Sequence, residues 1–333
     1  MLQSLQVFRG LAAAAVVLVH ASVSTEAFVG QVPDVLMRAF QLGGYGVDFF
    51  FVLSGFIIMH AHMGKPQTRA MMKGYALKRV VRIFPAYWPI GLGVIAMYFL
   101  LPNLSASGGR EFGWLTSFFL IPSELPPALP VAWTLVHELM FYAVFLLYFW
   151  GHRYFLAGLL VWLALIVVFQ DLPSASAGAS RYSLSVLNIE FMFGVVAALM
   201  HQRTSSQYWV RVYLWLGMVV FIWQMAALYM ASPLAHRLML AAGLALLIVS
   251  FACRDRSAPT EWPSCLLHMG NASYSIYLVH GPLLSVTQRA LSHATDSWVI
   301  ALLTGIALSL LGGSVYHRSI ERPATAWAKQ RWS

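Results

Sequence analysis

The sequence predicts an all-α integral membrane protein, a polytopic bundle of about ten transmembrane helices. Of its 333 residues, 59% are hydrophobic and 10% are charged, whereas soluble proteins carry about a quarter charged residues. The mean hydropathy is +0.70. Ten apolar windows are each long enough to cross hydrocarbon, which is about 30 Å thick. We therefore expect one transmembrane domain over residues 1–333, with no separate soluble domain.

The first window, residues 5–23, has the length of a signal-peptide core, which is an alternative interpretation of the N-terminus. It contains Arg9 and His20, however, and the charge pattern of the following loops favours a membrane span. The two residues are eleven positions apart, about three helical turns. Both side chains therefore share one side of a helix, with an axial offset of roughly 16 Å.

The other nine windows follow in order along the chain. Residues 114–121 are apolar but too short to span, and four prolines follow by position 130, so this segment is expected to be interfacial or re-entrant. The nine windows are residues 43–63, 83–101, 132–150, 154–170, 184–201, 212–230, 238–253, 265–286 and 297–316.

Basic residues alternate between the two sides of this arrangement. Of the 21 Lys and Arg residues, 15 fall on one side, 5 on the other, and Arg9 lies within the first window. The positive-inside rule then places both termini in the cytosol, and it accounts for the net charge of +9 without a nucleic-acid partner.

Five titratable residues from five windows fall at a similar depth, in the outer half of the bundle. Charged and titratable groups within spans are costly, and they usually face the protein interior or a wet cavity. A shared outer chamber would explain their common level. The five residues are His20, Asp48, Glu138, Glu190 and His280.

Four of these five residues also have a structural explanation. His20 and Glu138 suit hydrogen bonds between helices. Asp48 suits a helix N-terminus, where the preceding Gly43, Gly44 and Gly46 allow close backbone approach. No motif surrounds Glu190, so we interpret it as structural.

The cytosolic half carries Arg9, Arg79 and Arg82. Arg79 and Arg82 share a face at i, i+3, and their guanidinium groups are suited to gripping phosphates bidentately. For this pair, the alternative roles are to orient the chain in the membrane by their positive charge and to contact anionic lipids. For Arg9 the alternative is snorkelling to the interface.

Five stretches, in their order along the chain, resemble the motifs of a known protein family. They are Arg9 and His20 with ten residues between them, residues 44–56, residues 79–87, Trp133-Thr134-Leu135 with Glu138, and residues 273–280. Together they resemble acyltransferase family 3 of membrane O-acyltransferases, over residues 4 to about 318.

The resemblance implies transfer of an acyl group, usually acetyl from cytosolic acetyl-CoA, to a hydroxyl of a carbohydrate. It implicates residues matching Arg9 and His20 in catalysis, and those matching Arg79 and Arg82 in function on the cytosolic side. The expected partners are acyl-CoA, a carbohydrate or glycolipid acceptor, the lipid bilayer and polysaccharide-synthesis machinery. No metal is expected.

We therefore predict His20, Arg9 and Glu138 as catalytic residues, and Arg9, Arg79 and Arg82 as donor-binding residues. The residues expected in the substrate chamber are Asp48, Ser54, Tyr277 and His280. The axial offset between Arg9 and His20, roughly 16 Å, is about the reach of an extended pantetheine arm. If the donor phosphates bind near the arginines, the thioester would therefore lie at His20.

In the favoured mechanism His20, oriented by Glu138, removes the proton of the acceptor hydroxyl. In a variant, His20 carries the acetyl group as an acyl-imidazole. Two other classes compete with the enzyme: a transporter or flippase of a polar or lipid-linked sugar, and a scaffold without activity.

Overall fold

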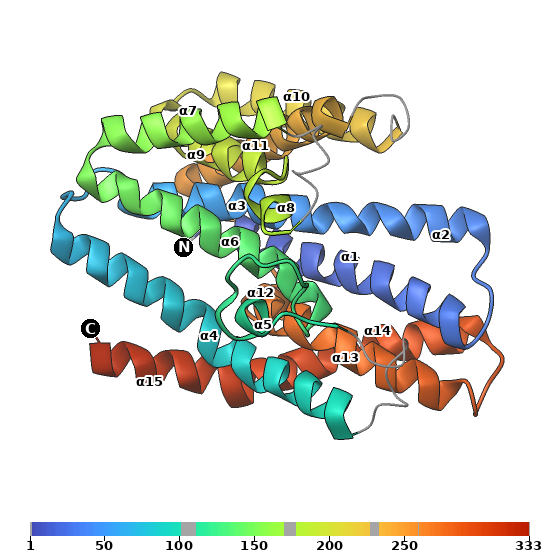
Figure 1. Cartoon of the computed structure of the whole chain (residues 1–333). Coiled ribbons are helices and arrows are strands. Elements are labelled where there is room, and N and C mark those ends of the chain that lie inside the picture. Colours follow the sequence, from blue (N-terminus) through green and yellow to red (C-terminus); the bar gives the residue numbers. More distant parts are fainter. Residues whose placement is uncertain (1, 101–110, 170–177, 227–232, 259, 333) are drawn as a thin grey trace. The chain divides into compact units, whose positions relative to one another are not determined.

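The structure, a computed structural model, describes residues 2–100, 111–169, 178–226, 233–258 and 260–332, and Figure 1 shows the whole chain. These residues form helices, turns and loops, with no strand among them. Nine helical segments within this part are long and apolar enough to cross a membrane. The predicted class, an all-α polytopic membrane protein, is therefore confirmed.

The helices follow the apolar windows of the sequence, with some differences in their bounds. The elements are α1 (Gln3–Phe28), α2 (Asp34–Gln41), η1 (Leu42–Gly44), α3 (Tyr45–His62), α4 (Arg69–Leu100), α5 (Trp114–Phe119), η3 (Pro130–Ala132), α6 (Trp133–Phe145), η4 (Leu146–Trp150), α7 (His152–Phe169), α8 (Ser180–Ser183), α9 (Asn188–Arg203), α10 (Gln207–Ala226), α11 (Pro233–Ser257), α12 (Ser264–Asn271), α13 (Ser273–Leu291), α14 (Trp298–Tyr316), the π-helical turn η6 (His317–Glu321) and α15 (Arg322–Trp332).

Two expected windows differ most from the observed helices. The window 83–101 belongs to α4, which already begins at Arg69, so Arg79 and Arg82 lie well inside a helix. The window 265–286 is divided between α12 and α13, with the break at Ala272, and it is not among the nine spans. Residues 101, 170 and 227–230 of the expected windows lie outside the described residues, as does Arg110 of the charge tally.

Residue contacts divide the chain into two compact units. Unit 1 comprises Met1–Lys65, Val186–Ser273 and Thr295–Leu302, and unit 2 comprises Pro66–Ser185, Tyr274–Ala294 and Leu303–Ser333. Each unit is therefore assembled from segments far apart in the sequence. The prediction of a single transmembrane domain stays a prediction.

In unit 1, α1 packs against α2, α3, α11 and α12. Glycines allow this packing, as the sequence suggested for the start of α3. A Cβ on Gly43 would overlap the carbonyl of Ala15, and one on Gly46 would lie 2.6 Å from the carbonyl oxygen of Ala12. A Cβ on Gly44 would meet nothing within 4 Å. Two of the three glycines thus serve the close approach that was predicted.

The packing of α3 against α9 depends on a second pair of glycines, Gly55 and Gly194. A Cβ on Gly194 would lie 2.7 Å from the backbone nitrogen of Phe56 and would overlap the carbonyl of Val52. Both obstacles are backbone atoms, which cannot move aside as a flexible side chain can. The two helices must therefore separate to admit any side chain at this position.

We expect Gly194→Ala to destabilise the protein by about 1 to 3 kcal/mol, because this crossing would be overpacked. The measurement is the thermal unfolding midpoint of the purified protein in detergent. Gly74→Ala in α4 is the matched control, since its Cβ would meet nothing within 4 Å. Equal midpoints for the two variants would contradict the assigned packing.

In unit 2, α4 packs against α5, α6, η4, η6 and α15, while α6 packs against α7 and α8. The short helix α5 corresponds to the segment that was predicted to be too short to span. Two side chains of α4 hold it: the Tyr87 hydroxyl donates to the carbonyl of Ser117 at 2.6 Å, and Trp88 Nε1 donates to that of Phe118 at 2.9 Å. The segment is thus anchored by hydrogen bonds to its peptide groups.

Candidate active site

His20 lies on α1, which runs without interruption through both Arg9 and His20 as predicted. His20 is an exposed residue, and its Nδ1 lies 3.0 Å from the carbonyl oxygen of Val16, one turn earlier. A carbonyl can only accept, so Nδ1 carries the proton of this hydrogen bond. In this tautomer the lone pair belongs to Nε2, and the imidazole is suited to act as a base through that atom.

Arg9 is half-buried and belongs to a short chain of hydrogen bonds at the other end of α1. Its Nη1 donates to Oε1 of Gln6 at 3.2 Å, and Nε2 of Gln6 donates to Oδ1 of Asn271 at 2.8 Å. A Cβ on Gly270 would overlap the backbone of Gln6, so α12 approaches α1 closely here. The break between α12 and α13 thus follows directly after the residue that orients Gln6.

Asp48 lies in the first turn of α3 and is 3% exposed. It forms an ion pair with Arg237 of α11, whose Nη1 also lies 3.3 Å from Oε1 of Glu190, a fully buried residue of α9. One guanidinium therefore serves two carboxylates. The predicted structural role of Glu190 agrees with this ion pair, and the predicted place of Asp48 in a substrate chamber stays a prediction.

Sequence reasoning missed Arg237, because it was counted among the loop cations. In the structure it lies within α11, which begins at Pro233. The available signal was the need for compensation: two carboxylates within spans require a counter-charge. An arginine at the edge of an apolar window was the nearest candidate.

The predicted donor-site arginines of α4 have different surroundings. Arg82 Nη1 lies 2.6 Å from Oε1 of Glu321, which is 3% exposed. The guanidinium carbon of Arg79 lies 5.7 Å from the ring centroid of Tyr75 and 5.4 Å from that of Tyr142. Arg82 is therefore paired with a carboxylate, whereas Arg79 packs over aromatic rings.

Glu138 lies in α6 and accepts a hydrogen bond from the hydroxyl of Tyr142, one turn further along the same helix. Because Tyr142 also packs under Arg79, it connects the predicted catalytic carboxylate with one predicted donor-site arginine. Tyr142 was not predicted from the sequence. Its i, i+4 spacing from Glu138 was the signal that could have identified it.

Two residues predicted for the substrate chamber lie on α13. The Tyr277 hydroxyl contacts Oγ1 of Thr134 at 3.0 Å and donates to the carbonyl of Val131 at 3.2 Å. His280 is fully buried, and its Nδ1 lies 3.3 Å from the carbonyl oxygen of Ile276. The two rings are 5.7 Å apart. The fourth residue of that set, Ser54, is half-buried in α3.

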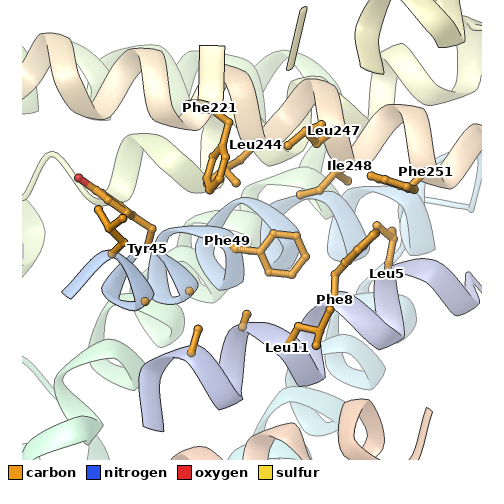
Figure 2. Close-up of a pocket in the computed structure, with 15 residues that line it drawn as sticks. Leu5, Phe8, Leu11, Tyr45, Phe49, Phe221, Leu244, Leu247, Ile248 and Phe251 are labelled. Atoms are coloured by element: carbon orange, nitrogen blue, oxygen red, sulfur yellow. The ribbon is translucent and has the colours of Figure 1, made fainter. Parts of the chain in front are cut away.

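An apolar pocket of about 290 Å³ lies within unit 1, beside the helix that carries Arg9 and His20. Side chains from α1, α3, α10 and α11 surround it, including Phe8, Phe49 and Phe221 (Figure 2). The hydroxyl of Tyr45 is the one polar side-chain group among the residues that line it. Neither Arg9 nor His20 lines it, so this pocket suits hydrocarbon better than a sugar or a nucleotide.

The predicted site residues belong to both units. Within unit 2 the structure groups Arg79 with Glu138 through Tyr142. Within unit 1, Asp48 is paired with Arg237. In the described ranges, no three His, Cys, Asp or Glu residues are placed to hold a metal ion. The predicted chamber formed by all the site residues together stays a prediction.

Long apolar helices that carry buried ion pairs and titratable side chains define an integral membrane protein with a polar interior. The chain belongs to acyltransferase family 3, whose profile, described as an acyltransferase domain, matches residues 2–317. It is therefore an acyltransferase. This membership favours the enzyme over the transporter and the scaffold that the composition alone left open.

Several characterised proteins are similar along most of the chain. An exopolysaccharide production protein, ExoZ of Rhizobium meliloti, is 27% identical over 308 residues, which cover 85% of this chain and 90% of the relative. The acyltransferase MdmB of Streptomyces mycarofaciens is 25% identical, over 97% of this chain and 91% of its own. The peptidoglycan O-acetyltransferase OatA of Listeria monocytogenes is 25% identical, over 84% of this chain and 51% of its own. No solved structure matches the chain.

Proposed function

We propose that this protein transfers an acetyl group from cytosolic acetyl-CoA to a hydroxyl of a cell-surface carbohydrate, or of the lipid-linked precursor of that carbohydrate. Family membership supports the acyl transfer. The names of two relatives, an exopolysaccharide production protein and a peptidoglycan O-acetyltransferase, support the carbohydrate acceptor. The bacterial inner membrane is the proposed location, with both termini and the donor on the cytosolic side.

The observation that carries the mechanism is the hydrogen bond from His20 Nδ1 to the carbonyl of Val16. It fixes the tautomer in which Nε2 can accept a proton. In the proposed step, Nε2 takes the proton of the acceptor hydroxyl while its oxygen attacks the thioester carbonyl. The carbon–sulfur bond then breaks, the coenzyme leaves as a thiolate, and the proton of the imidazolium passes to that thiolate.

In the relay variant, Nε2 itself attacks the thioester carbonyl, the carbon–sulfur bond breaks, and the coenzyme leaves as a thiolate. The acceptor hydroxyl then takes the acetyl group from the acyl-imidazole, which restores the imidazole, and the hydroxyl proton passes to the thiolate. Labelled acetyl-CoA supplied without acceptor distinguishes the two paths. Direct transfer leaves no label on the protein, whereas the relay leaves one label that His20→Gln abolishes. Glu138 is proposed as a further catalytic residue, held by the hydroxyl of Tyr142.

The function is tested by supplying purified protein in lipid nanodiscs with radiolabelled acetyl-CoA and a set of oligosaccharide acceptors. We expect label in an alkali-labile ester on the sugar. The comparison sample is the same preparation of His20→Ala. If acetyl-CoA is not consumed with any carbohydrate or glycolipid acceptor, while another acyl donor is, the proposed donor is wrong.

We expect Arg79→Gln to weaken the binding of acetyl-CoA by about 10- to 100-fold, because a charged hydrogen bond to phosphate contributes about 1.5 to 3 kcal/mol. Equilibrium binding of radiolabelled acetyl-CoA to protein in nanodiscs measures this. Arg79→Lys keeps the charge but not the bidentate geometry and should lie in between. Arg38→Gln is the control, because Arg38 is an exposed residue of α2. Equal affinity of the wild type and Arg79→Gln would remove Arg79 from the donor site.

A further inference from the structure

Glu321 is a buried carboxylate with three partners. It lies at the end of the π-helical turn η6 and is 3% exposed. Its Oε1 accepts from Nη1 of Arg82 at 2.6 Å, and its Oε2 accepts from Oγ of Ser275 at 2.6 Å and from Nδ1 of His317 at 2.8 Å. These contacts join α4, α13 and η6 within unit 2. Such π-helical turns occur frequently at functional sites.

The ion pair makes Arg79 and Arg82 of α4 electrostatically different. Arg82 and Glu321 together carry no net charge, so they contribute little to long-range attraction of an anion. Among the described residues, no carboxylate lies within ion-pair distance of Arg79. Its Nε is buried without a hydrogen-bond partner, and its neighbours Tyr75 and Tyr142 are uncharged rings. Within the described part of the chain, Arg79 therefore has no direct ion pair, and Glu138 is connected to it through the hydroxyl of Tyr142.

The position of Arg82 also affects Arg79, because the two residues are three positions apart on the same face of α4. A side chain held at 2.6 Å by a buried carboxylate fixes the rotation of the helix at that turn. The guanidinium carbon of Arg82 also lies 5.0 Å from the ring centroid of Tyr274, the neighbour of Ser275 on α13. Arg82 is thus held from two sides.

From these contacts we infer that Glu321 and Arg82 form a neutral tether that positions α4, and that Arg79 is the guanidinium left to attract the phosphates of the acyl donor. Glu321 is then a positioning residue that acts through Arg82. This inference rests on the proposed function, since it takes a nucleotide-bearing acyl donor as the anion. It assigns to Arg82 a different role from that of Arg79, although both belong to one sequence motif.

The test compares single and paired neutral variants of the full chain in nanodiscs, with binding of radiolabelled acetyl-CoA as the readout. Arg82→Gln leaves a buried carboxylate without its counter-charge, and we expect binding to weaken by about tenfold or more. The pair Arg82→Gln with Glu321→Gln has no unpaired charge. We expect its affinity to return to within about threefold of the wild type.

The opposite outcome is equally clear. If Arg82 itself held the donor phosphates, the paired variant would bind acetyl-CoA as weakly as Arg82→Gln, and the inference would be overturned. Combining Arg79→Gln with Glu321→Gln tests the other half, and we expect no recovery there. Glu261→Gln, which removes an exposed carboxylate from a loop, is the control for a change of net charge.

Thermal unfolding gives a second readout that does not need the donor. We expect a lower midpoint for Arg82→Gln and recovery in the paired variant; a paired variant no more stable than Arg82→Gln contradicts the tether. If Arg82→Gln does not fold, the paired variant is compared with the wild type and with Arg79→Gln.

A wild-type protein that does not bind acetyl-CoA contradicts the proposed donor and the role of Arg79. A wild type that binds, with a paired variant that does not, contradicts this inference alone.

Discussion

His20→Ala is expected to lower the rate of acetyl transfer by about 10²- to 10⁴-fold, the range that a positioned general base contributes. The reason is specific to the Nε2 atom: Nδ1 is already engaged by the carbonyl of Val16. His20→Gln should be as inactive as His20→Ala, because an amide cannot accept the proton. The measurement is the initial rate of ester formation on an oligosaccharide acceptor, at equal amounts of folded protein.

His293→Gln is the matched control for His20, because His293 is an exposed histidine in the loop after α13. We expect wild-type rates from it. Acetyl-CoA binding by His20→Ala should also be close to that of the wild type, since the base acts on the acceptor. If neither substitution at His20 slows transfer, both direct transfer and the acyl-imidazole relay are wrong, while the family membership stands.

The second large effect concerns stability rather than chemistry. Arg237→Gln leaves Asp48 and Glu190 buried without a counter-charge, and removal of one partner from such a group costs about 3 to 5 kcal/mol. We expect a correspondingly lower free energy of unfolding, measured by titration with a denaturing detergent. Among the molecules that remain folded, we expect the affinity for acetyl-CoA to be unchanged.

The neutral combination of Arg237→Gln, Asp48→Asn and Glu190→Gln should recover most of that loss, because no unpaired charge remains. Arg38→Gln is the control, since Arg38 is exposed on α2. A triple variant less stable than Arg237→Gln would mean that the protein needs the two carboxylates for a reason other than their ion pair with Arg237. In that case Asp48 would retain its predicted place among residues that contact substrate.

The sequence predicted the helices well where a single strong signal decides their position. The apolar run around Arg9 and His20 predicted α1, because a run of that length forms a helix whatever its neighbours. The start of α4 at Arg69 was missed, since hydropathy places a span where the apolar residues begin. A helix can continue through Lys78, Arg79 and Arg82, however, because basic residues are good helix formers.

The break between α12 and α13 was missed for a different reason. Hydropathy does not record that Gly270 meets the backbone of Gln6 or that Asn271 binds the Gln6 side chain. These are tertiary contacts of residues more than 260 positions apart, since Gln6 and Asn271 are separated by 265. Local patterns carry no information about such pairs.

The candidate site shows the same limit. Arg79, Arg82 and Glu138 could be selected as candidates from the sequence, because their types and spacing suggest chemistry directly. Tyr142, which contacts Arg79 and Glu138, and Glu321, which pairs with Arg82, could not be selected, because a tyrosine in an apolar helix and a single acidic residue in a basic tail look ordinary. Only the fold shows that Glu321 is buried beside Arg82.

The order of synthesis gives the Asp48 ion pair a further meaning. Arg237 follows Asp48 by 189 residues, which a ribosome adds in about 10 to 40 s at about 5 to 20 residues per second. During that interval α3 has left the ribosome, but α11 has not been made. The helix that carries Asp48 therefore lacks its counter-ion in the nascent protein until α11 is added to unit 1.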